Sequence, residues 1–238
     1  MSKDNSMATI RPERRQGGFT ILEMSVVLVV IALIIGAVSV GRDVYRSAVA
    51  ERISSDFVQG WIIAYDRYTA QVGAVPGDDP ANPTGRINGA AGSALCDDDL
   101  RDEMLSRGIA LPQGRAEGME NRYVYQDGNG GPQELRVCLL NVNDWSEPAA
   151  GATYAARPRN VMRFEGLTAE LAGQIDLRLD GRIDARFGRF REDSRYDDTS
   201  AVGSPPAANP WSEAEPDPAT YNREENIPTM VGYLKMNR

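Results

Sequence analysis

The chain has 238 residues, of which 42% are hydrophobic and 25% are charged, a composition typical of a folded protein rather than a disordered one. The formal net charge of −8 makes the surface repel phosphates on average, which argues against a general role in binding nucleic acid. Histidine is absent, and this excludes Ser-His-Asp and Cys-His catalysis and the commonest protein ligand of zinc and iron.

Residues 1–18 form a polar leader whose basic residues lie near its end and would stay on the cytoplasmic side of a membrane. Residues 19–41 follow as an apolar segment, long enough to span a bilayer core at about 1.5 Å rise per residue. Glu23 is the only charged residue in this segment. A charge inside a membrane helix costs roughly 3 kcal/mol on insertion scales, so Glu23 requires a partner.

A cleaved secretory signal or a plain signal anchor would also contain an apolar run, but neither accounts for Glu23 or for the boundary between Gly18 and Phe19. Gly18-Phe19-Thr-Ile-Leu-Glu23, after a basic leader and before a charge-free helix, resembles the prepilin motif of type IV pilins and of type II secretion pseudopilins. The resemblance covers residues 14–72 well and the remainder only in general layout. It implies cleavage between Gly18 and Phe19 by a membrane aspartyl peptidase, and N-methylation of the new Phe19 amine.

The resemblance also implies a partner for Glu23. The positive amine of Phe19, created by cleavage, would pair with Glu23 of a neighbouring copy in a helical homo-oligomeric filament. The precursor would lie in inner-membrane lipid and meet a prepilin peptidase/methyltransferase, an assembly platform and other pilins or pseudopilins. The filament would then be extracellular or periplasmic.

A surface pilus is favoured over a secretion pseudopilus, and a membrane-anchored periplasmic enzyme that uses carboxylates is a more distant alternative. No acidic pair has a spacing that identifies a catalytic site, so we expect a structural protein without a cofactor.

Residues 42–73 are predicted to continue the helix in amphipathic form. Apolar residues recur every three or four positions and form one face suited to pack on a sheet: Val49, Ile53, Phe57, Trp61, Ala64 and Tyr68. The helix should end between Gln71 and Gly73, before Val75-Pro76-Gly77.

Residues 74–238 are predicted to form a globular head with an antiparallel sheet, which makes the fold class α+β. A short helix is expected from Cys96 to Arg107, and residues 121–140 read as a hairpin around a Gly-rich turn. That turn resembles half a calcium loop but lacks its final bidentate acid, so a simple turn is favoured. A last strand is expected within residues 229–235.

The segment 167–191 has two interpretations. Apolar residues every four positions, with Thr168 as N-cap and Gly181 past the end, favour a helix followed by a strand from Ile183 to Arg191. Alternation between residues 175 and 187 would instead predict a hairpin turning at Asp180-Gly-Arg182. The helix is the preferred interpretation.

Cys96 and Cys138 have no CxxC spacing, so neither a redox motif nor a zinc knuckle is indicated. In an exported head they are expected to form one disulfide, which on the chain-entropy model would stabilise the fold by roughly 4 kcal/mol. In a cytosolic head they would be two buried thiols.

An acidic cluster lies near the end of the head among six arginines, at positions 178, 182, 186, 189, 191 and 195. Because pseudopilins can bind calcium through loop carboxylates near the C-terminus, Asp180 and Asp184 are the candidate ligands that the resemblance suggests. Mutual salt bridging is the favoured alternative. The same arginines are a candidate patch for an anionic ligand. Residues 204–218 form a Pro-rich acidic stretch that is expected to be an exposed loop for subunit or partner contacts.

Overall fold

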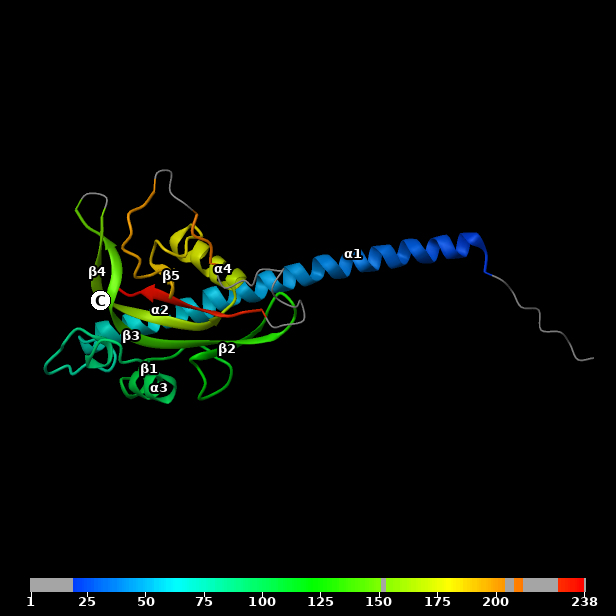
Figure 1. Ribbon diagram of the computed structural model, residues 1–238. Helices are drawn as coiled ribbons and strands as arrows, with labels where there is room; N and C mark the ends of the chain where they lie inside the picture. The colour runs from blue at the N-terminus through cyan, green and yellow to red at the C-terminus, as the bar shows by residue number, and fades with distance from the viewer. Residues whose placement is uncertain (1–18, 151–152, 204–207, 212–226, 238) are drawn as a thin grey trace, which may run out of the picture. The chain divides into compact units, whose positions relative to one another are not determined.

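A computed structural model describes residues 19–150, 153–203, 208–211 and 227–237, without the side chains of residues 42 and 43. The chain divides into two compact units, Met1–Tyr45 and Arg46–Arg238, which are described separately. The fold is α+β, because a long N-terminal helix precedes an antiparallel sheet, as the sequence predicts (Figure 1). The predicted loop at residues 204–218 lies mostly outside the described residues.

The N-terminal helix has three parts: α1 (Ile21–Arg52), a π-helical turn η1 (Ile53–Val58) and α2 (Gln59–Val72). It ends at Gly73, whose φ of 80° lets its N–H reach the carbonyl of Thr69 at 3.1 Å, so the predicted end is confirmed. Every predicted core residue from Ile53 onward is buried, while Val49 is partly buried.

The π-helical turn was not predicted, yet the spacing of the core residues explains it. Ile53, Phe57 and Trp61 are each four positions apart, and all three side chains are fully buried. Side chains spaced by four drift around an α-helix of 3.6 residues per turn. The wider π turn compensates for that drift and keeps all three on the face that packs in the head.

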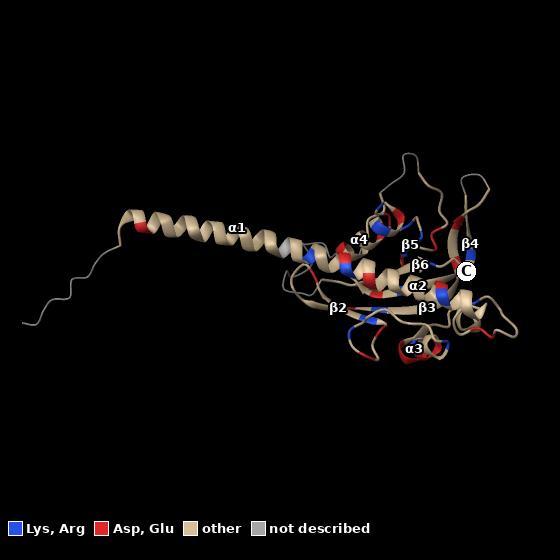
Figure 2. Cartoon of the chain, turned by 180° about the vertical axis from the view of Figure 1, so that it is seen from behind, with Lys and Arg blue, Asp and Glu red and all other residues tan. Residues whose placement is uncertain are grey.

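Within the described residues, the sheet has six antiparallel strands: β1 (Leu95–Cys96), β2 (Arg122–Gln126), β3 (Pro132–Pro148), β4 (Tyr154–Leu167), β5 (Phe190–Glu192) and β6 (Met230–Lys235). Their order is β1-β3-β4-β6-β5, and β2 also pairs with β3. The predicted hairpin is confirmed as β2 and β3, and the predicted last strand as β6. Figures 1 and 2, seen from opposite sides, show α2 lying along one face of this sheet.

The main core lies between that helix face and the sheet. The aromatic residues of the helix enter it and their polar atoms are satisfied, since Trp61 Nε1 donates to the carbonyl of Glu120 at 3.2 Å and Tyr68 donates to Glu103. A second, smaller core contains Leu140, Val142, Trp145, Val161 and Tyr233. Because successive side chains of a strand point to opposite faces, residues 137–142 of β3 and 160–162 of β4 are buried on both faces of the sheet.

The head also contains the short α-helices α3 (Asp97–Ser106) and α4 (Ala169–Asp180). The helix interpretation of residues 167–180 is confirmed, because Thr168 caps α4 by accepting the Leu171 N–H at 3.3 Å and Gly181 follows in the left-handed conformation. The alternative hairpin in this segment is wrong.

The predicted strand from Ile183 to Arg191 is wrong over most of its length, since only β5 is extended and paired. Side chains hold the preceding loop in place of a strand partner. Asp180 Oδ2 accepts the N–H groups of Arg189 and Phe190 at 2.7 and 2.9 Å. Gly188, with φ of 100°, allows that carboxylate to approach, because an added Cβ would lie 2.3 Å from Asp180 Oδ2.

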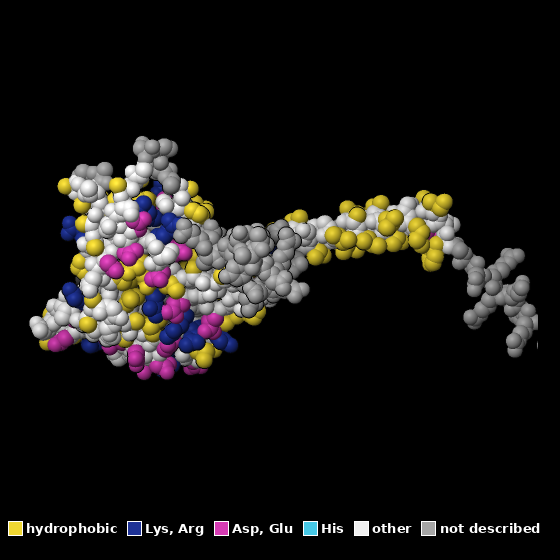
Figure 3. Space-filling view, in the orientation of Figure 1, with side chains coloured by type: hydrophobic (Ala, Val, Ile, Leu, Met, Phe, Trp, Pro, Cys, Tyr) yellow, Lys and Arg dark blue, Asp and Glu magenta, His cyan; other side chains and the backbone are white. Residues whose placement is uncertain are grey.

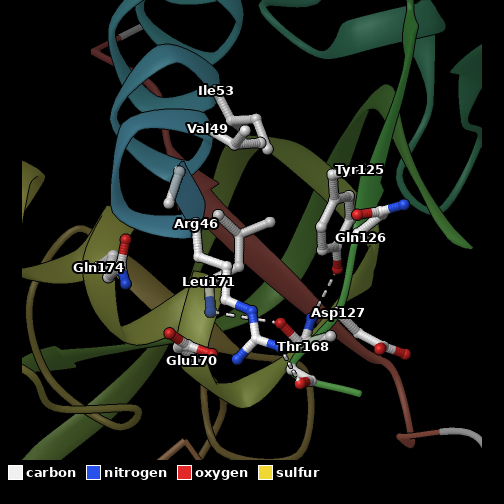
Figure 4. Close-up of a pocket in the computed structure, with 12 residues that line it drawn as sticks. Arg46, Val49, Ile53, Tyr125, Gln126, Asp127, Thr168, Glu170, Leu171 and Gln174 are labelled. Carbon is white, nitrogen blue, oxygen red and sulfur yellow. Dashed lines mark hydrogen bonds between the residues drawn. The ribbon is translucent and has the colours of Figure 1, made fainter. Parts of the chain in front are cut away.

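At the start of the second unit, Arg46 donates a hydrogen bond of 2.5 Å from Nη2 to the carbonyl of Gly128. Figure 4 shows its guanidinium beside the turn that starts at Asp127. Asp127 is buried and accepts the N–H groups of Asn129 and Gly131 at 2.9 and 2.8 Å, so the segment is the predicted turn. The adjacent cavity measures about 30 Å³, room for about one water molecule and too small for an organic ligand.

Candidate assembly site at the start of the N-terminal helix

The described chain begins with Phe19 and Thr20, and the helix begins immediately after them. Glu23 Oε2 accepts hydrogen bonds from the N–H and the hydroxyl of Thr20 at 3.0 and 3.1 Å. The Thr20 hydroxyl oxygen in turn accepts the N–H of Glu23 at 3.2 Å. This is a reciprocal capping box, and its sequence signature is Thr-x-x-Glu. This role of Thr20 was not predicted, although the Thr-x-x-Glu signature in the sequence could have revealed it.

Glu23 has no cationic partner within the part of the chain that the structure describes. Hydrogen bonds from Thr20 satisfy part of the carboxylate, but they do not neutralise its charge. The cap explains how the acid is tolerated at a helix start, where the positive end of the helix dipole also favours it. It does not supply the opposite charge that a membrane or a filament core would demand.

After Glu23 the helix presents an exposed apolar surface. The large hydrophobic side chains between Met24 and Val40 are 43% to 69% exposed, and Figure 3 shows no acidic or basic side chain among them on the face in view. In Figure 2 this part of α1 carries no Asp, Glu, Lys or Arg after the acidic residue at its start, whereas charged residues are frequent farther along the chain. Near its start, the hydroxyl of Ser25 donates to the carbonyl of Leu22 at 2.8 Å. The surface is therefore predominantly apolar.

By length and composition, this is one helix able to cross a membrane, and its most apolar window has no buried residue. Gly36 and Gly41 lie on it with no heavy atom within 4 Å of an added Cβ. Small residues of this kind let membrane helices approach closely. An apolar N-terminal helix of this kind fits a membrane-anchored precursor.

Gly18 and the leader lie outside the described residues, so the site of processing remains a prediction. The domain boundaries expected from the sequence also stay predictions.

The disulfide is present in the structure: Cys96 is bonded to Cys138. The two residues are directly opposite one another in the pairing of β1 with β3. The bond therefore fixes the segment that leads into α3 to the longest strand of the sheet, as the sequence interpretation for an exported head predicts.

Asp180 and Asp184, the calcium candidates, direct their oxygens at the protein's own donors. Asp184 Oδ1 accepts the N–H groups of Arg186 and Phe187, each at 3.1 Å, while Asp180 holds the loop before β5 as described above. Among the described residues, no group of three or more acidic or cysteine side chains is arranged to hold a metal. These carboxylates organise the loop.

Asp176 completes this arrangement from within α4. It is fully buried, and its Oδ2 accepts the N–H of Asp184 and the indole N–H of Trp211, both at 2.7 Å. Burial raises the pKa of Asp176 to about 7, against hydrogen bonds from Trp211 and Asp184 that favour the charged form.

Salt bridging of the neighbouring arginines is confirmed for most of the cluster. Ion pairs join Arg182 to Asp184 at 2.9 Å, Arg186 to Asp198 at 3.0 Å and Arg195 to Glu192 at 4.0 Å, and Arg178 pairs with Glu51. Arg191 differs, because it is buried and donates to backbone carbonyls instead.

Comparison with known proteins addresses the N-terminal site. The family model for the prokaryotic N-terminal methylation motif matches residues 14–39. No curated protein and no solved structure matches the chain. The matched residues include the Gly18–Phe19 boundary, the capping pair of Thr20 and Glu23, and most of the exposed apolar surface. The chain therefore carries the N-terminal signature of type IV prepilins and pseudopilins.

Proposed function

We propose that this protein is a structural subunit of a type IV pilus-like filament, polymerised through its N-terminal helix. The observation that carries the proposal is the exposed, charge-free surface after Glu23, which lies within the residues that match the methylation motif. An apolar surface of this length needs lipid or other apolar helices around it. A filament core of identical helices supplies those neighbours once the subunit leaves the membrane.

Processing at Gly18–Phe19 would supply the positive charge that Glu23 needs as a partner. Hydrolysis of that peptide bond leaves a positive amine on Phe19, and methylation of the nitrogen preserves the positive charge. Phe19 is already 80% exposed, so its new amine is accessible to another subunit. The leader would be removed on the cytoplasmic face by a prepilin peptidase/methyltransferase.

In the filament, Glu23 of one subunit pairs with the Phe19 amine of a neighbour. Two charges in an apolar core are tolerated only when they are close, and an incoming helix in the wrong axial register would leave both unpaired. The pair therefore selects register more than it adds stability. An inner-membrane assembly platform and other pilins would act as partners, with the disulfide-linked head on the outside of the filament.

Isolation of surface filaments tests the proposal. We expect sheared filaments from producing cells to contain this chain, with a mature N-terminus at N-methyl-Phe19 by N-terminal sequencing and mass spectrometry. A processed subunit that never enters surface filaments, but whose deletion blocks protein secretion, would favour the pseudopilin alternative. An uncleaved and unmethylated chain in the membrane would contradict both filament functions.

A further inference from the structure

A second cavity in the head, of about 660 Å³, has the size of a ligand site. It lies between the hairpin of β3 and β4 and the loop that precedes β5. Its lining combines two aromatic rings, two arginines and two polar side chains: Tyr154, Phe187, Arg182, Arg191, Asp184 and Asn209.

Arg191 is the unusual member of this lining, because only 5% of it is exposed. Its Nε donates to the carbonyl of Gly188 at 2.9 Å, and Nη1 donates to the carbonyls of Ser146 and Tyr196 at 2.7 and 3.2 Å. Its guanidinium also lies 4.4 Å from the ring centre of Trp145. The side chain is thus held rigidly by four separate contacts.

These contacts orient the guanidinium, and the carboxylates of Glu147, Asp180 and Asp184 favour its positive charge from a distance. No carboxylate forms an ion pair with Arg191 in the described ranges, and its Nη2 makes no hydrogen bond there. Burial lowers the pKa of Arg191 to about 10, which reflects the cost of holding this cation away from water. A fixed, buried cation in the wall of a cavity, with no direct ion pair among the described residues, matches one carboxylate of a ligand.

The aromatic part of the lining suits the body of a ring. Tyr154 and Phe187 are half-buried, with ring centres 5.5 Å apart, and Arg186 lies over Phe187 at 4.9 Å. Such rings offer apolar surface in the lining of the cavity, and Arg182, whose Nη2 pairs with Asp184 at 2.9 Å, provides further donors for hydroxyl groups. Asp184 would repel a doubly charged phosphate more strongly than a single carboxylate.

We propose that this cavity binds an acidic saccharide, with the ligand carboxylate on Arg191 Nη2 and a sugar ring against Tyr154 and Phe187. The cavity holds more than one ring, so an oligosaccharide that contains uronate units is the expected class. Binding would give the head a recognition function that does not depend on filament assembly.

Calorimetric titration of the detergent-solubilised full-length protein tests this site, with triglucuronate as ligand and an uncharged glucose trisaccharide and acetate as controls. We expect saturable binding of triglucuronate only. Because lysine cannot reproduce the fork of a guanidinium, Arg191→Lys should weaken binding at least about tenfold. Tyr154→Leu should weaken it by several-fold without touching the buried cation. Arg157→Ala, which removes an exposed arginine outside the cavity, is the matched control and should bind as the native protein does.

Thermal unfolding monitored by circular dichroism identifies any variant that fails to fold. If Arg191→Lys does not fold, the affinity of Tyr154→Leu and Arg182→Ala for triglucuronate tests the site instead. Absence of triglucuronate binding by the native protein would overturn the proposal. Equal binding of the uncharged trisaccharide, or unchanged affinity in the folded cavity variants, would overturn it as well.

Discussion

Glu23 and Thr20 cap one another at the start of α1: the Glu23 carboxylate accepts the Thr20 N–H at 3.0 Å, and the Thr20 hydroxyl accepts the Glu23 N–H at 3.2 Å. The cap needs an acceptor at position 23, whereas the proposed pairing with Phe19 needs a negative charge there. These two requirements can be separated, because glutamine also completes a capping box but carries no charge.

Glu23→Gln should therefore preserve the helix start and its processing, yet prevent assembly as severely as Glu23→Ala does. We expect surface filaments to fall at least about tenfold in both variants, the factor that corresponds to a loss of about 1.4 kcal/mol at each addition step. Filament yield after shearing, with processing checked by the mass of the membrane-bound subunit, measures the effect.

Glu51→Gln is the matched control on the same helix. Glu51 is exposed and forms an ion pair with Arg178, so its loss should cost less than about 1 kcal/mol and leave filament yield near normal. Native filament yield from Glu23→Gln would show that the cap is sufficient and that charge pairing does not direct assembly.

The disulfide is expected to be a main source of stability in the head. Cys96→Ser/Cys138→Ser should lower the free energy of unfolding by roughly 4 kcal/mol, since the bond closes a loop across a sequence separation of 42. Chemical unfolding of the full-length protein in detergent measures this loss. Dithiothreitol should destabilise the native protein to about the same degree and leave the double variant unchanged. If the free energy of unfolding of the native protein is unchanged after complete reduction, the prediction is contradicted.

Two glycines with the same backbone conformation allow the cost of a positive φ to be separated from the cost of a steric clash with an added Cβ. Gly166 and Gly181 have φ of 81° and 74°, but an added Cβ would lie 2.1 Å from the Glu134 carbonyl oxygen at Gly166 and would meet nothing within 4 Å at Gly181. Gly181→Ala should cost about 1–2 kcal/mol from the left-handed conformation alone. Gly166→Ala should cost clearly more, because the pairing of β3 with β4 must shift. Equal losses in urea unfolding would show that the sheet relaxes around the new methyl group.

The parts of the fold that the sequence predicted are those fixed by local signals. The spacing of Ile53, Phe57 and Trp61 indicated the buried helix face, and Thr168 with Gly181 marked both ends of α4. At the N-terminal site, the glycine boundary, the acid and the charge-free run are contiguous in sequence, so that motif could be identified without a fold.

The parts that it missed depend on partners distant in sequence. Strand β4 was not predicted, because Arg157-Pro158-Arg159 interrupts its apolar pattern and its pairing with β3 and β6 supplies the stability. In the loop before β5, apolar and polar residues alternate as in a strand, but the carboxylates of Asp176 and Asp180 accept hydrogen bonds from its N–H groups. The burial of Arg191 could not be predicted either, because one of the carbonyls that accept its hydrogen bonds belongs to Ser146, which is distant in sequence.

Asp176 gives the head a pH dependence with a defined sign. Its pKa is raised from 3.8 to about 7, chiefly by burial, so between these values the folded protein binds more protons than the unfolded chain. The contribution of Asp176 to the free energy of unfolding should therefore be largest below about pH 4 and fall as pH rises toward 7, by up to about 1.4 kcal/mol per pH unit.

Asp176→Asn tests this sign directly, because asparagine keeps an oxygen that accepts the N–H groups of Asp184 and Trp211 but does not titrate. The difference in unfolding free energy between the variant and the native protein, measured in urea at pH 4.5 and 7.5, should move in favour of the variant at the higher pH. Asp66→Asn, at an exposed position of α2, controls for the general loss of an acidic residue and should leave the native slope intact. If Asp176→Asn also leaves the slope unchanged, Asp176 is ionised in the folded head across this range, and its charge must be balanced by the donors of the loop that it holds.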